Sequence, residues 1–432
     1  MSASSLMSVV GTAPLNRAQI KVVVIASLLM IIDGYDLVSF GSALPLILAD
    51  WGADPVVLGY VASSALLGVF LGGLFIAPLA DRFGRKPMIA ITILAASVAA
   101  FLCGFVHDPY TLAALRLVVG MSIGGLMPNF MALTAEVSPP RYKAVFVSTV
   151  SAFYAIGGLL AAFVGIWLAP VYGWRIVFFV AGASIVMVPI VLKMLPESPE
   201  YLLVKRDTVR LQRVLDEVSP GTRAEDLAAA ARTPAPRSRV RQILSRRNAL
   251  ATIFIWVFFI MTMILSYALL TWLPVLMRNS GYELNNAILT LVALNFGGFI
   301  GSILGGILAT RFTFRRTLIV YFGTAVVALV CLSFNPAMVA LYGLLFVAGA
   351  AIIGILAIIH AFTVEFYPAA VRSTGVGWAT GVGRIGAIAG PIIGGILVAA
   401  QLPLQASFLV FIIPAVVGCI AVIIVAARKY QS

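Results

Sequence analysis

The stretch APLADRFGRKP, residues 77–87, is a short charged loop between two long apolar runs. A related stretch, LATRFTFRR at residues 308–316, also follows an apolar run and also places a phenylalanine directly after an arginine. Aligning Arg82 with Arg311 brings the two loops into register. A charged loop that recurs at corresponding places in the two halves of a chain indicates an internal repeat. We therefore expect two related halves.

The composition is that of a membrane protein. Of the 432 residues, 62% are hydrophobic and 10% are charged, and the mean hydropathy is +1.08. No soluble fold needs so much apolar surface. The three cysteines lie in apolar runs and indicate neither a disulfide framework nor a metal site. The residues before Ala18 lack a signal-peptide pattern, so we expect the first apolar run to stay in place.

Twelve apolar runs are long enough to cross a hydrocarbon core as helices, which takes about 20 residues. They cover about 20–48, 56–80, 88–106, 110–133, 145–169, 175–195, 249–276, 284–309, 317–335, 337–362, 374–400 and 404–427. The sequence thus predicts an all-α membrane protein with two pseudo-symmetric six-helix halves, residues 1–195 and 249–432. A central cytoplasmic linker, residues 196–248, joins them. Within it we expect an amphipathic helix over Tyr201–Val218, followed by a stretch rich in Ala, Pro and Arg.

The positive charges predict the orientation. If both termini are cytoplasmic, 25 of the 29 Lys and Arg residues fall in inside segments, as the positive-inside rule requires. We therefore expect a multi-pass protein of the cell (inner or plasma) membrane. The net charge of +13 then reflects topology and attraction to anionic lipid of the bilayer, and no nucleic acid partner.

Asp33-Gly34-Tyr35-Asp36 places two carboxylates inside the first apolar run. At helical spacing they fall on one side of the helix. A buried acid at membrane depth costs at least ~2.5 kcal/mol, so such acids usually line a cavity or carry a function. Two desolvated carboxylates this close resist ionising together. We predict that Asp33 and Asp36 titrate as a pair and carry protons; structural acids held by a neighbouring helix are the alternative.

Two arginines also lie inside apolar runs. Arg384 follows Arg372 by 12 residues, about 18 Å of helix, at a depth comparable with that of Asp33. Its planar fork suits a carboxylate. We expect it to bind a substrate carboxylate, or to pair with Asp33 or Asp36 until substrate displaces it; a purely structural pair remains open. Arg116 is expected to meet an acid of the first span or the substrate, with structural pairing again open.

The D-R-F-G-R-K core of the first loop resembles the signature of the major facilitator superfamily, G-x-x-x-D-R-x-G-R-[KR], with Ala77 at the leading glycine. Four further stretches resemble the aromatic acid:proton symporter family, whose members include carriers of benzoate and hydroxybenzoates. These are DGYD, RLVVGMSIGGLMPN at 116–129, EVSPPRYKA at 136–144 and RSTGVGWATGVGRIGAIAGP at 372–391. The resemblance implies a secondary transporter, not an enzyme, that imports an aromatic acid with protons by alternating access. It also implies a role in proton coupling for Arg116, which opens an R-x-x-x-G pattern.

Polar and aromatic residues of the spans provide candidate walls for an aromatic substrate, although helix packing or a place at the membrane interface is the alternative for each. They are Tyr35, Asn129, Phe130, Tyr267, Asn295 and Trp378. Charged residues at the cytoplasmic helix ends are expected to form ion pairs that hold an inner gate shut, the alternative being a solvated charged face. They are Asp81, Arg82, Arg85, Lys86, Glu136, Arg141 and Arg372.

His360 is the one histidine inside a span, where a proton-relay role is open. With two histidines and no acid cluster around them, no metal site is expected. No cofactor besides the coupling proton and no obligatory protein partner are expected either. Three alternatives remain: symport of another organic anion or a sugar-like metabolite, since PESPEYLL at 196–203 also resembles sugar carriers; drug/proton antiport, against which Arg384 argues; and a transporter-like sensor without flux.

Overall fold

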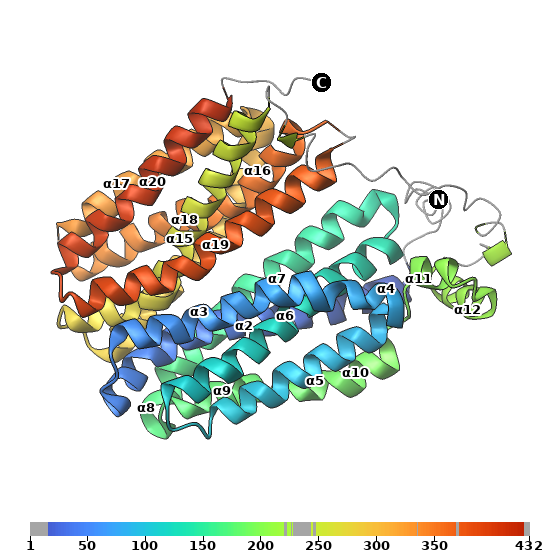
Figure 1. Cartoon of the computed structure of the whole chain (residues 1–432), viewed down its shortest axis with the longest axis horizontal. Helices are drawn as coiled ribbons and strands as arrows, with labels where there is room; N and C mark the ends of the chain where they lie inside the picture. Colours follow the sequence, from blue (N-terminus) through green and yellow to red (C-terminus); the bar gives the residue numbers. More distant parts are fainter. Residues whose placement is uncertain are drawn as a thin grey trace.

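The computed structural model describes residues 16–219, 223–225, 227, 243–244, 248–334, 336–368 and 371–426. Every regular element in these ranges is helical, and twelve helices in them are long and apolar enough to cross a membrane. The predicted fold class is confirmed: the chain is an all-α, multi-pass membrane protein. Its helices form two bundles that lie side by side, one blue to green and one yellow to red in Figure 1.

The first half contains the helices from α2 to α10. They are α2 (Arg17–Trp51), α3 (Pro55–Leu71), η1 (Gly72–Ile76), η2 (Ala77–Leu79), α4 (Ala80–Phe83), α5 (Arg85–Cys103), α6 (Pro109–Val137), α7 (Pro140–Trp167), α8 (Ala169–Tyr172), α9 (Arg175–Gly182), η3 (Ala183–Val186) and α10 (Met187–Met194). Helix α3 continues through the π-helix η1 into α4, and α9 continues through η3 into α10, so these segments provide one span each.

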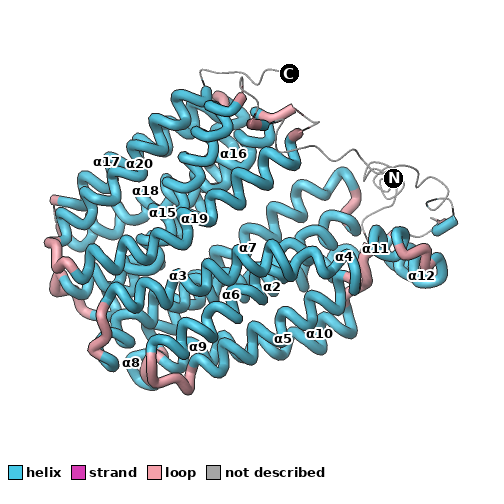
Figure 2. The backbone as a smooth tube through the Cα atoms, viewed as in Figure 1, coloured by secondary structure: helices cyan, strands magenta, loops and turns pink. Residues whose placement is uncertain are grey.

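The second half contains the helices from α15 to α20. They are α15 (Ala249–Asn279), α16 (Leu284–Arg311), α17 (Phe314–Ser333), α18 (Met338–Phe366), α19 (Arg372–Ala399) and α20 (Leu404–Ala426). Between the halves lie the two linker helices α11 (Pro199–Val204) and α12 (Thr208–Val218). We call the end of the molecule at which α11 and α12 lie the linker end, and the opposite end the far end (Figure 2).

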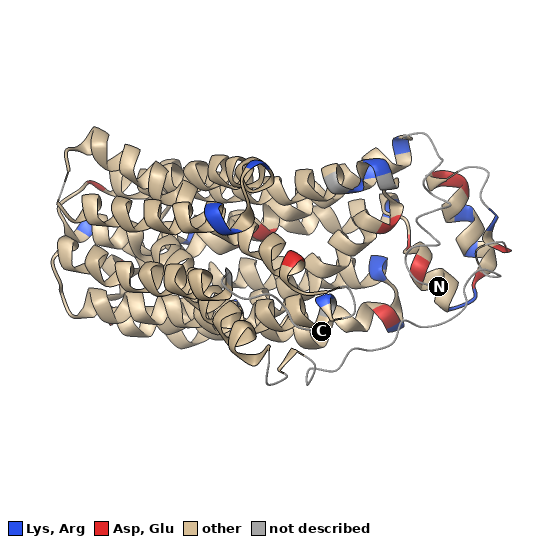
Figure 3. Cartoon of the chain, turned by 90° about the horizontal axis from the view of Figure 1, so that it is seen from above, with Lys and Arg blue, Asp and Glu red and all other residues tan. Residues whose placement is uncertain are grey.

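Local sequence signals begin these helices. Asn16 caps α2 in a capping box, because its Oδ1 accepts the N–H of Gln19 at 3.0 Å while the Gln19 Oε1 accepts the N–H of Asn16 at 3.2 Å. Asp54 and Asp108 cap α3 and α6 with a side-chain oxygen, and each is followed by a proline at the first helical position. Charged residues gather toward the linker end, and few lie in the middle of the bundles (Figure 3).

The halves meet along three helix pairs: α3 packs on α19, α7 on α16, and α2 on α15. The close contacts lie toward the far end. The Ser63 Oγ donates to the carbonyl of Ile388 at 2.6 Å, and a side chain at Gly41 would collide with the carbonyl of Leu270. Glycine thus permits close approach of the backbones here. Toward the linker end α3 and α19 diverge (Figure 1).

The linker departs from the single helix expected over Tyr201–Val218. The chain breaks at Arg206, which has a left-handed φ of 58°, and the Asp207 Oδ1 then caps α12 by accepting the N–H of Arg210 at 3.0 Å. A capping aspartate starts a new helix where periodicity alone would continue the old one. The stretch rich in Ala, Pro and Arg that we expected after this helix lies mostly outside the described residues.

Helix α12 is anchored to the start of α2. The Asn16 Nδ2 donates to the carbonyls of Glu217 and Val218 at 2.8 and 3.0 Å, and the Gln19 Nε2 donates to the carbonyl of Val218 at 2.9 Å. These bonds satisfy carbonyls that a helix end leaves without partners. These bonds attach α12 to the first half.

Candidate functional site

A cluster of charged and phenolic side chains lies at mid-depth, where the halves meet. Asp33 of α2 and Arg384 of α19 interact electrostatically, although they come from different halves. Arg384 also interacts with Tyr154 of α7 and Tyr267 of α15. Asp33 is 8% exposed, so water screens its charge little. The sequence estimate of a shared depth for Asp33 and Arg384 agrees with this arrangement.

Close helix packing within each half positions this cluster. A side chain at Gly34 would collide with the backbone carbonyl of Tyr154, and one at Gly386 would collide with the carbonyl of Ile260. Glycine thus lets α2 approach α7 and lets α19 approach α15. Among the described residues, no carboxylate oxygen lies within 4.0 Å of the Arg384 guanidinium. Its planar fork therefore has no carboxylate of these residues bound to it, although it interacts with Asp33 and with the Tyr267 hydroxyl.

Asp36 has a different partner from Asp33. The Arg116 Nη1 lies 2.7 Å from the Asp36 Oδ1, and the side chains of Arg116 and Asp36 are 2% and 8% exposed. The Arg116 guanidinium carbon also lies 5.5 Å from the centroid of the Phe40 ring, within the range of a cation–π contact. This pair joins α2 to α6 inside the first half. Asp33 and Asp36 still interact with each other, but each interacts with a different arginine.

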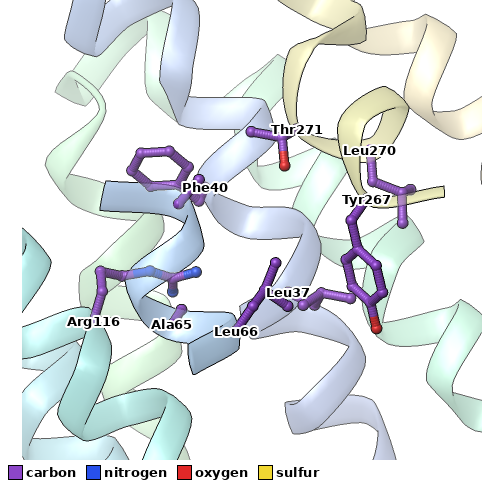
Figure 4. Close-up of a pocket in the computed structure, with 9 residues that line it drawn as sticks. Leu37, Phe40, Ala65, Leu66, Arg116, Tyr267, Leu270 and Thr271 are labelled. Carbon is purple, nitrogen blue, oxygen red and sulfur yellow. The ribbon is translucent and has the colours of Figure 1, made fainter. Parts of the chain in front are cut away.

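A small cavity separates the Arg116 pair from the second half (Figure 4). Its volume is about 10 Å³, and it is lined by Leu37, Phe40, Ala62, Ala65, Leu66, Arg116, Tyr267, Leu270 and Thr271. Such a volume holds about one water molecule and no aromatic ring. Residues of both halves contribute to this lining, and most of them are apolar.

Three of the predicted substrate contacts point into the first half. The Tyr35 hydroxyl donates to the carbonyl of Val177 at 2.8 Å. The Asn129 Nδ2 donates to the carbonyl of Gly125 at 2.7 Å, and Phe130 lies in an apolar core of the first half. The structure places them in helix packing, the alternative left open for each. Periodicity could not distinguish the two, because both faces of these helices are apolar.

The other predicted contacts lie at or near the region between the halves. Tyr267 belongs to the mid-depth cluster. The Asn295 side chain of α16 lies against Gly158 of α7, across the interface. Trp378 is 45% exposed and stacks on Trp256 with 6.0 Å between ring centroids.

The charged loop of residues 77–87 is tied to its own half. Arg85 pairs with Glu136 at 2.5 Å, and Glu136 accepts a hydrogen bond from the Ser198 hydroxyl at 2.5 Å. The Glu197 Oε1 accepts the backbone N–H groups of Arg85 and Lys86 at 2.8 and 3.1 Å. The start of the linker therefore holds the loop against α6.

The remaining gate candidates make no ion pair within the part of the chain that the structure describes. Asp81, Arg82 and Arg141 are exposed, and the Arg372 Nε donates to the carbonyl of Tyr367 at 3.1 Å. No ion pair between described residues joins the two halves at the linker end. Within the described ranges, the expected clasp between the halves is thus not formed at this end, where α3 and α19 diverge (Figure 1).

The family follows from sequence comparison. The family model of the major facilitator superfamily matches residues 26–334 and 286–431. The chain belongs to this superfamily. Within it, the chain is similar to transporters of aromatic acids and is a member of that family. It is 39% identical to the benzoate transport protein of Acinetobacter baylyi, over 95% of this chain and 90% of that one. It is 31% identical to the gentisate transporter of Corynebacterium glutamicum, over 94% and 87%.

Solved structures show the same facilitator fold. An inward-facing, occupied bacterial homologue of the human lysosomal transporter Spinster aligns with a TM-score of 0.76 at 16% identity, over 97% of this chain and 100% of that one. The partially occluded, inward-open xylose transporter XylE from E. coli aligns with a TM-score of 0.76 at 14% identity, over 96% and 99%. The superfamily match and the sequence relatives show that the chain is a transporter, in agreement with the expectation that it is not an enzyme.

Two further residues lie in the central region of this facilitator. Tyr154 was not among the residues predicted from the sequence, although its place near the middle of α7 matches the depth of Asp33. His360 of α18 interacts electrostatically with Arg384, and its ring centroid lies 5.1 Å from that of Phe259. No group of three or more His, Cys, Asp or Glu among the described residues could hold a metal ion.

Proposed function

We propose that this facilitator imports an aromatic carboxylate of the benzoate or hydroxybenzoate class in symport with protons, by alternating access. One observation carries the proposal: Arg384 of one half and Asp33 of the other interact at mid-depth, with no carboxylate of the described residues paired to Arg384. A substrate carboxylate supplies the missing anion. Benzoate and gentisate, the compounds for which these two relatives are named, are aromatic acids of this kind.

The two aspartates divide the work of coupling. Asp33 competes with the substrate carboxylate for Arg384, so protonation of Asp33 frees the guanidinium for the substrate. Asp36 and Arg116 form a second buried pair on the same helix, and protonation of Asp36 weakens that pair. Protons therefore favour the substrate-bound carrier, while an empty carrier with ionised aspartates is held by its internal interactions.

Proton coupling also meets the electrical cost of import. An inside-negative potential opposes entry of one negative charge by ~2.3 kcal/mol per 100 mV. One accompanying proton cancels that charge, and a second adds the potential to the driving force. We place the protein in the cell membrane with both termini and the linker end in the cytoplasm. The end at which α3 and α19 diverge then faces the cytoplasm, and the end at which the halves pack closely faces the outside (Figure 1).

Uptake into proteoliposomes tests this function. Under an imposed gradient, acid outside, labelled benzoate is expected to accumulate above its external concentration, and a protonophore is expected to abolish the accumulation. Efflux of a cationic dye with no aromatic acid uptake would identify a drug/proton antiporter instead. Binding of benzoate without flux would identify a sensor. Accumulation of a sugar or an aliphatic acid alone would move the substrate outside the aromatic class.

A further inference from the structure

The second half holds a polar side chain near Arg384 that the proposed coupling does not use. His360 lies in α18, six residues before the helix ends at the linker end. Its Nδ1 is buried and has no hydrogen-bond partner among the described residues. A buried nitrogen without a partner lowers the stability of the fold, so its presence calls for an explanation. A neutral imidazole offers one donor and one acceptor.

The geometry gives this histidine a defined place beside the site. Its ring lies 5.1 Å from that of Phe259, tilted by 43°, which limits its rotation. Phe259 in turn packs beside Gly383, the residue preceding Arg384. Contacts among α15, α18 and α19 thus place the His360 imidazole and the Arg384 guanidinium in the same part of the second half. The two groups interact electrostatically.

Depth along the bundle sets the spacing between the two groups. Arg384 lies 12 residues from the linker-end start of α19, about 18 Å, and His360 lies six residues from the linker-end terminus of α18, about 9 Å. Their backbone positions therefore differ in depth by about 9 Å.

We propose that His360 is a specificity-determining residue that hydrogen-bonds a ring hydroxyl of the substrate, with the carboxylate bound at Arg384. This inference rests on the proposed function and adds the substrate's ring substituent to it. A hydroxyl at ring position 3 or 4 points away from the carboxylate and toward His360. A hydroxyl at position 2 lies beside the carboxylate and bonds to it internally, so it makes no use of His360.

Competition in proteoliposomes tests the assignment, with labelled benzoate as the reporter and 2-, 3- and 4-hydroxybenzoate as competitors. His360→Phe keeps a ring and removes both nitrogens. We expect the affinity for the 3- or 4-hydroxy acid to fall about 3- to 10-fold, as for the loss of one neutral hydrogen bond. Affinities for benzoate and 2-hydroxybenzoate should stay within about twofold. His360→Asn, which keeps a polar group near Nδ1, should restore part of the loss.

The chain offers a matched control, since it has only two histidines. His107 is exposed in the loop before α6, and His107→Phe should change none of these affinities. An equal loss for all four acids in His360→Phe would overturn the assignment, because it would indicate a general role in folding or coupling. Unchanged affinities would overturn it as well. A wild-type protein that takes up no aromatic acid would overturn the proposed function first, and this inference with it.

Discussion

Asp36 and Arg116 form an ion pair at 2.7 Å that is almost completely buried between α2 and α6. Three residues earlier on the same helix, Asp33 interacts electrostatically with Arg384 of the other half. With about 3.6 residues per turn, residues three apart lie on the same side of a helix but point in somewhat different directions. That difference is enough to give each aspartate its own arginine. The pair inside one half and the interaction across the halves can then respond to protons separately.

Breaking the buried pair should destabilise the first half. Arg116→Ala leaves the Asp36 carboxylate without its cation, and removal of one partner of a buried pair costs about 3–5 kcal/mol. We expect a lower unfolding temperature and a reduced folded yield in detergent. The double variant Asp36→Asn/Arg116→Gln, which removes both charges, should recover much of the loss. A double variant as unstable as the single one would contradict the explanation that the unpaired Asp36 charge causes the loss of stability.

Substitution of Arg384 should affect substrate affinity and leave folding intact. Arg384→Lys keeps the charge but loses the fork that binds a carboxylate through two bonds. We expect the KM for benzoate to rise at least about tenfold, with an unchanged unfolding temperature. Arg278→Lys, an exposed position near the end of α15, is the control. Uptake with wild-type KM in Arg384→Lys would refute binding of the carboxylate there.

Removal of the titratable carboxyl group of Asp33 should uncouple transport from protons. Asp33→Asn is neutral at every pH and mimics the protonated side chain, so benzoate should exchange across the membrane without accumulating. We expect counterflow to persist while uphill uptake and its dependence on the pH gradient disappear. Uphill, pH-dependent uptake by Asp33→Asn would show that another group carries the proton.

Tyr35 offers a test of its placement in the helix bundle. Tyr35→Phe removes the hydrogen bond to the carbonyl of Val177 and should lower the free energy of unfolding by about 0.5–1.5 kcal/mol. Because the hydroxyl points away from the region between the halves, the KM for benzoate should not change. Tyr267→Phe, at the mid-depth cluster, is the contrasting variant, for which we expect a raised KM. A raised KM in Tyr35→Phe alone would reverse the two placements.

The sequence alone was sufficient for the twelve spans, the two halves, the family and the depth of the charged residues. Those properties depend on hydrophobicity, short motifs and distance along the chain, all of which can be read from the sequence without knowing which helices are in contact. An acid such as Asp33 can be recognised in an apolar run without its partner, because burial of a carboxylate at membrane depth is costly in itself.

Only the tertiary structure decided which side chain meets which. Helices that are apolar on all faces carry little periodic signal for their rotation, so Tyr35 could not be assigned to the bundle, nor Tyr154 to the site, from spacing. Rotation depends on contacts between helices far apart in the sequence, such as Gly34 against Tyr154. The pairing of Asp36 with Arg116 and the approach of Asp33 to Arg384 are therefore properties of the packed halves.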